Sequence, residues 1–143
     1  MSNEFQLWFK STLFEIVPGE DEAINPGCYG KSLANWLRVK LIARGYDIED
    51  IIPEDWGWCV MCRRSPFKLW VGCGSLANSE KAPPDRPPAS GRNITWTCFV
   101  RAEPSLFVRF FRRIDTIPAV RELYEVVRSI LTSEPAITII DSI

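Results

Sequence analysis

The first residues of the chain alternate between apolar and polar side chains. From residue 4 to residue 10 every second residue is apolar, in the order Phe5, Leu7 and Phe9. A period of two residues is typical of a strand with one buried face, so a first strand is predicted here. Pro18-Gly19 and the acidic run that follows it break this pattern.

A helical period replaces the alternation after residue 25. Asn25-Pro26 offers a cap followed by a first-turn proline, and the helix is predicted to begin between this pair and Tyr29. Gly45 stands where a glycine that ends a helix is expected. The predicted buried face of this helix consists of Leu33, Trp36, Leu37 and Leu41.

Two further helices are predicted towards the end of the chain. Residues 104–113 form a short one. Residues 118–131 form a longer one that Glu134-Pro135 stops. The apolar face of the longer helix holds Val120, Leu123, Tyr124, Val127 and Leu131.

The remaining periodic segments predict strands. Residues 46–52 form a short strand or extended link that ends at Pro53, and residues 136–140 add a final edge strand. Between them lie a hairpin of residues 56–63 and 67–74, turning at Ser65-Pro66, and a strand of residues 94–101. Hairpin-linked strands with interspersed helices indicate a single α+β domain over residues 1–143. Its sheet is mainly antiparallel, with about five strands and with helices packed on one face.

Residues 75–93 differ from the rest of the chain. They contain four prolines, several serines and no apolar period. A structureless connection of this length is uncommon inside a compact domain, so a mobile loop is predicted here.

Composition and charge narrow the choice of partners. The chain has 143 residues, an apolar fraction of 46% and a net charge of −1, which fits one globular domain with a core. This charge gives no global attraction to nucleic acid or to anionic lipid. Neither a secretory signal nor a run of roughly twenty apolar residues is found, so the prediction is a cytoplasmic protein without a membrane partner.

The chain contains no histidine, and this excludes more chemistry than any other count. It removes Ser-His-Asp and Cys-His nucleophile activation and every metal site that needs an imidazole. The five cysteines, at irregular spacing, are predicted to be reduced and mostly buried. No cofactor, no metal and no catalytic residue is predicted.

The densest stretch of chemistry is EDWGWCVMCRR, residues 54–64. Cys59 and Cys62 match C-x-x-C, the spacing of zinc and redox sites. In a strand, however, residues three apart point to opposite faces and cannot converge on one metal. Both thiols are therefore predicted to be reduced, unpaired and on opposite faces of the strand.

Tryptophans and acids give the same stretch a candidate interaction surface. Trp56 and Trp58 are predicted on one face of the strand, one of them in the core and one at the surface, with Trp56 the more exposed because it adjoins the acidic turn Glu54-Asp55. Exposed apolar patches usually mark interaction sites. A basic helix face further along the chain joins the candidates. The predicted interaction residues are Glu54, Asp55, Trp56, Trp58, Arg109, Arg112 and Arg113.

The alternative site is Gly72-Cys73-Gly74. Glycines on either side of a thiol let a substrate or another backbone segment approach closely. A small-molecule site or a Cys-dependent enzyme built on Cys73 would need activation by Arg, Lys or a helix terminus, because there is no histidine. Simple packing of the glycines beneath an aromatic ring explains the same pattern.

Part of the chain resembles a known group of proteins. The succession YGKSLANWLRVKLIARGYDIEDIIPEDWGWCVMC, followed by PFKLWVGCG, resembles small stand-alone bacterial proteins of no assigned activity, with PEDWGW as the most specific segment. The resemblance implies a bacterial cytoplasmic α+β domain and assigns no ligand residues. In size and layout alone, the chain is also similar to immunity proteins that inhibit toxins.

Two functions follow as hypotheses. The first is a non-enzymatic protein-binding module, an immunity or inhibitor type of protein, whose partner is another protein. The second is the small-molecule-binding domain or enzyme at Gly72-Cys73-Gly74. A homodimer is compatible with either hypothesis.

Overall fold

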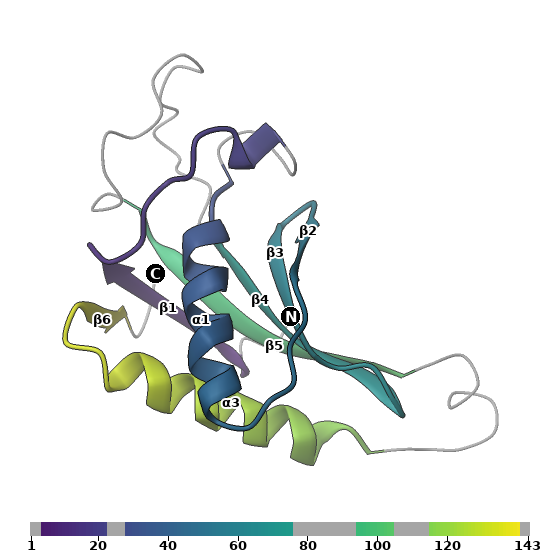
Figure 1. Cartoon of the computed structure of the whole chain (residues 1–143). Helices are drawn as coiled ribbons and strands as arrows, with labels where there is room; N and C mark the ends of the chain where they lie inside the picture. Colours follow the sequence, from purple (N-terminus) through teal and green to yellow (C-terminus); the bar gives the residue numbers. More distant parts are fainter. Residues whose placement is uncertain (1–3, 23–27, 76–93, 105–114, 141–143) are drawn as a thin grey trace.

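In the described part of the chain, a six-stranded antiparallel sheet carries two helices on one of its faces (Figure 1). The computed structural model describes residues 4–22, 28–75, 94–104 and 115–140. The α+β class and the placement of helices on one face are confirmed. The sheet has six strands where about five were predicted.

The chain order of the strands differs from their order in the sheet. The strands are β1 (Gln6–Ser11), β2 (Ile51–Glu54), β3 (Gly57–Arg63), β4 (Phe67–Ser75), β5 (Trp96–Pro104) and β6 (Ile137–Ile140). Across the sheet they follow the order β2-β3-β4-β5-β1-β6. β1 therefore pairs with two strands that are distant in sequence, opposite Cys98 of β5 through Leu7 and opposite Ile139 of β6 through Phe9.

The helices are α1 (Lys31–Ala43) and α3 (Ile117–Thr132), and a 3₁₀ turn, η1 (Glu20–Glu22), precedes α1. α1 packs against β3 and β4, whereas α3 packs against β5 and β6. The apolar period of residues 118–131 becomes the buried face of α3. Gly45 follows α1 with φ of 97°, a conformation that glycine adopts at little cost, as predicted for the residue that ends this helix.

The core lies between the helices and the sheet. Strand alternation turns every second residue towards the helices, so that Trp58, Val60 and Cys62 of β3 join the core while Cys59 does not. The largest fully buried side chains are Trp96, Phe9, Phe14, Leu33, Leu37, Leu41, Leu69, Leu123 and Leu131.

Some predicted boundaries are wrong, each for a local reason. β2 begins at Ile51 and contains Pro53, which was predicted to end a strand. β2 lies at the edge of the sheet, where the backbone N–H that proline lacks costs little. β5 runs on to Pro104, so this proline ends a strand and does not begin a helix.

Other predictions fall outside the described residues. The rest of the predicted helix 104–113 lies there, and with it Arg109, Arg112 and Arg113. The predicted loop of residues 75–93 also lies outside the described residues, except for Ser75, which ends β4. Within the described ranges, none of the helices combines the length and the apolar character that crossing a membrane requires.

Candidate functional site

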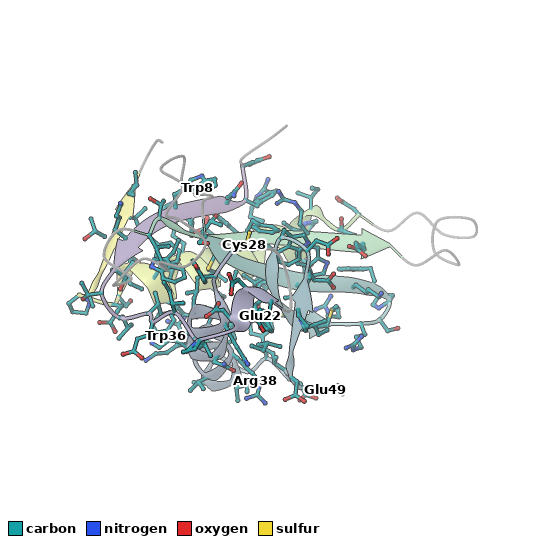
Figure 2. All side chains as sticks on the ribbon, turned by 90° about the horizontal axis from the view of Figure 1, so that it is seen from above. Trp8, Glu22, Cys28, Trp36, Arg38 and Glu49 are labelled. Atoms are coloured by element: carbon teal, nitrogen blue, oxygen red, sulfur yellow. The ribbon has the colours of Figure 1, made fainter. Side chains whose placement is uncertain are left out.

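The sheet face opposite α1 and α3, called the open face below, carries the candidate site. Figure 2 shows Trp8 on this face, on the other side of the sheet from Trp36 and Arg38 of α1. The strand registers place on it a row of polar and aromatic side chains. Its residues include Gln6, Trp8, Lys10, Cys59, Met61, Lys68, Trp70, Phe99, Arg101 and Glu103.

Two glycines of β4 make room on this face for aromatic side chains. A Cβ atom on Gly72 would lie 2.3 Å from Cζ of Phe99, which stands opposite it on β5. A Cβ atom on Gly74 would lie 3.0 Å from the backbone oxygen of Trp56. The phenyl ring therefore lies over one glycine and the backbone at Trp56 lies over the other, because neither glycine has a side chain.

Three rings meet above these glycines and form the aromatic cluster, defined as Trp56, Trp70 and Phe99. The indoles of Trp56 and Trp70 stack with centroids 5.2 Å apart and an interplanar angle of 12°. The ring of Phe99 meets both edge-on, at 5.1 Å from Trp56 and 5.8 Å from Trp70. The Arg101 guanidinium lies 5.1 Å from the Phe99 centroid and adds a cation–π contact.

Exposure differs sharply within the cluster. Trp70 is 9% exposed, whereas Trp56, which stacks on it, is 37% exposed. Trp70 thus forms the buried floor of the cluster and Trp56 presents part of its indole to the surroundings. An exposed Trp held rigidly by stacking costs little conformational entropy when it binds a partner.

Trp56 and Trp58 differ in exposure as predicted, but they do not share the predicted common face. Trp58 is 4% exposed and belongs to the core, with the Lys31 ammonium 5.4 Å from its ring, so one core and one exposed tryptophan are confirmed. Trp56 precedes β3 and reaches the open face, so the shared face is wrong. The cause is Gly57, whose φ of 150° is a backbone conformation that residues with a side chain rarely adopt. A Cβ atom at this position would also lie only 2.4 Å from the backbone oxygen of Cys73.

The acidic turn that precedes β3 lies beside this cluster. Glu54 ends β2, Asp55 directly precedes Trp56, and both side chains are exposed. The Glu54 carboxylate is thus accessible to a partner that contacts Trp56. Glu54, Asp55 and Trp56 were predicted from the sequence, whereas Trp70 and Phe99 were not. The two glycines spaced two apart on β4 were the signal that could have indicated rings above them.

The cysteines are placed for packing. Cys59 and Cys62 lie on opposite faces of β3, as predicted, and all five cysteines are free. Burial raises the pKa of the Cys59 thiol and of the Cys62 thiol to about 12. The Glu54 and Glu103 carboxylates add to this effect at Cys59. Within the described part of the chain, no group of three or more His, Cys, Asp or Glu side chains could hold a metal ion.

Cys73 lies in the core and away from any surface. Its side chain is fully buried on the helix side of β4, with Sγ 3.9 Å from Sγ of Cys98. Burial raises the pKa of the Cys73 thiol well above its ordinary value, and the neighbouring Cys98 thiol adds to this. Because the thiolate is the nucleophilic form, this geometry gives no support to catalysis by Cys73.

The thiol environments predict which cysteine reacts in the native protein. Cys28 is half-buried and the other four are buried, so a thiol reagent should label Cys28 alone. The selectivity should persist at about pH 9, where an ordinary cysteine is largely thiolate. Intact-mass spectrometry should count one label per native chain and five after unfolding. Native labelling of Cys59 or Cys73 would contradict this placement.

Comparison with known protein families, curated proteins and solved structures gives no match for this chain.

Proposed function

We propose that the protein is a non-enzymatic protein-binding module whose binding surface is the open face, centred on the aromatic cluster. The observation that carries the proposal is the stacked pair of Trp56 and Trp70, with Trp56 37% exposed on a face that neither described helix covers.

The energetics of interfaces support this choice. Tryptophan and arginine are enriched among the few residues that dominate binding energies, and such residues sit at the centre of a patch that excludes water. Trp56 has Trp70 and Phe99 as neighbours, and Arg101 contacts Phe99 from the same face. The rings already pack against one another in the unbound protein, so a partner would meet a preformed surface.

The surroundings of the cluster favour a protein partner. Lys68 and Glu103 stand directly opposite each other on β4 and β5, and the exposed Glu54-Asp55 turn adjoins Trp56. An apolar centre with a rim of both charges is the usual anatomy of a protein–protein interface. The finer form of the proposal is an immunity or inhibitor protein, whose partner is a toxin. It rests on likeness of size and layout, and a toxin-like neighbouring reading frame would support it.

The test is affinity purification from the native host with quantitative mass spectrometry. Wild-type protein should retain a specific protein that Trp56→Ala loses. Measured with that purified partner, the affinity should fall by about 2 kcal/mol or more, which corresponds to roughly thirty-fold.

A matched control separates the cluster from exposed apolar area in general. Val39 is 61% exposed on α1, on the helix side of the molecule, so Val39→Ala should bind like wild type. Both variants should melt close to the wild-type temperature. Equal partner retention by Trp56→Ala and wild type would overturn the proposal.

A further inference from the structure

The sheet ends in two edges that differ in chemistry. β2 forms one edge and β6 the other, which Figure 1 shows at the outer side of β1. An edge strand presents unpaired backbone groups that can template pairing with another chain, and natural proteins block such edges with proline, charge or a cover.

The β2 edge carries these protections. Pro53 lies within the strand and has no N–H to offer. The exposed acids Glu49 and Asp50 precede the strand, and Glu54 ends it. A second strand approaching this edge would meet a proline and like charges, so β2 is unsuited to pairing.

The β6 edge has these features only beyond its ends, with Glu134-Pro135 before the strand and Asp141 after it. Its sequence is Ile-Thr-Ile-Ile, without charge, proline or glycine, and every residue is β-branched. β-branched residues are those that favour strands most strongly. Among the strands that the structure describes, none pairs with the outer side of β6.

The register fixes which backbone groups of β6 point outward. The Val100 N–H of β5 donates to the Phe5 carbonyl, which lies just before β1. Backbone groups along a strand point alternately to its two neighbours, so Phe5, Leu7 and Phe9 direct theirs towards β5. The residues between them, Trp8 and Lys10, direct theirs to β6, where they face Ile140 and Thr138.

Ile137 and Ile139 are therefore the residues whose backbone groups point away from β1. The Ile137 N–H is used locally, because it donates to the Glu134 carbonyl at 3.1 Å. The outer edge of β6 thus offers the N–H and carbonyl of Ile139 and the carbonyl of Ile137. An antiparallel strand that places its own Ile139 opposite this residue would exchange two hydrogen bonds with it.

We propose that β6 is a dimerisation edge, at which β6 of a second copy of this chain pairs antiparallel about a two-fold axis through Ile139. The edge is self-complementary in the way an isologous contact requires, because each copy supplies the same donor, the same acceptor and the same uncharged side chains. Thr138 of one copy then lies beside Ile140 of the other on the open face.

The dimer would join the two sheets into one. Because the axis is perpendicular to the sheet, α1 and α3 of both copies lie on the same side, and both aromatic clusters lie on the other. A two-site surface of this kind raises avidity for a partner with two matching sites. The edge proposal stands without the proposed function, because it uses no residue of the aromatic cluster.

The test measures the mass in solution, by light scattering and by analytical ultracentrifugation over a dilution series. Wild-type protein should have twice the mass of one chain at high concentration. Ile139→Pro removes the outward N–H together with a side chain that packs against the core, and should halve that mass. Ile139→Val keeps the N–H and should remain dimeric. Thr138→Lys, at an exposed position, adds the charge that protects natural edges and should also give single chains.

Amide hydrogen exchange of the wild-type protein provides a readout that needs no variant. The Ile139 amide should be protected at high concentration and exchange faster on dilution, whereas the Thr138 and Ile140 amides, which face β1, should be protected at both. A single-chain mass throughout the series would overturn the proposal. So would a dimer that persists in both Ile139→Pro and Thr138→Lys, or one that Trp56→Ala dissociates.

Discussion

Replacing Trp58 by alanine is expected to lower the free energy of unfolding by roughly 3–5 kcal/mol, the range for a buried tryptophan reduced to a methyl group. Trp58 is 4% exposed and packs in the core between β3 and α1, where the surrounding side chains can close only part of the cavity. Urea unfolding followed by fluorescence and circular dichroism measures the change, with the dependence on urea expected to stay constant.

Two further variants make this result specific. The Trp58 indole N–H is buried and has no hydrogen-bond partner among the described residues, so Trp58→Phe gives up none of their hydrogen bonds and should cost clearly less than Trp58→Ala. Trp56→Ala removes a ring that is 37% exposed and should cost less than half as much as Trp58→Ala. Equal losses for Trp56→Ala and Trp58→Ala would place both rings in the core and remove the main support for a binding surface at Trp56.

The helix periods were the parts of the fold that sequence predicted best. The apolar face of residues 118–131 repeats over four turns, and α3 follows it within one residue at each end. A long amphipathic period has one geometric interpretation, because its apolar side chains must face the core whatever the rest of the chain does. Local periodicity was therefore sufficient here.

Trp56 shows where local periodicity fails. Counting by two from Trp58 places Trp56 on the core side, and this count holds only while the chain remains extended. Gly57, at φ of 150°, breaks it where the chain passes close to the Cys73 carbonyl of the neighbouring strand. That constraint is tertiary and leaves no pattern within residues 54–64 beyond the glycine itself.

The aromatic cluster could be predicted only in part for the same reason. Trp70 and Phe99 come from different strands, and their contact depends on a register that pairs Gly72 with Phe99 although residues 76–95 separate the two strands. The sequence indicates that a ring covers a glycine, but the identity of the ring requires the pairing of β4 with β5. Register of this kind is set by the whole buried face of a sheet.

Glu20 is a further residue whose role the sequence concealed, because an acidic run after Pro18-Gly19 is normally a solvated turn. In the structure Glu20 is 3% exposed and its carboxylate accepts three backbone hydrogen bonds. The donors are the N–H groups of Val17 at 2.5 Å, Gly30 at 2.7 Å and Lys31 at 3.0 Å. Since Gly30 and Lys31 begin α1, Glu20 caps that helix from a different part of the chain.

Glu20→Ala is expected to destabilise the protein by about 3 kcal/mol or more, because it leaves backbone N–H groups without an acceptor, at about 1–3 kcal/mol for each one that water cannot reach. Glu20→Gln keeps one acceptor oxygen and should lose less. Glu22→Ala is the matched control, because Glu22 lies in the same 3₁₀ turn but is exposed, and it should stay within about 0.5 kcal/mol of wild type.

Urea unfolding of the wild type and the three variants measures the order of their free energies of unfolding. If Glu20→Ala were as stable as Glu22→Ala, the start of α1 would be held by its packing against β4 alone. Gly30 lies so close to that strand that a Cβ atom on it would come within 2.7 Å of the Cys73 carbonyl oxygen.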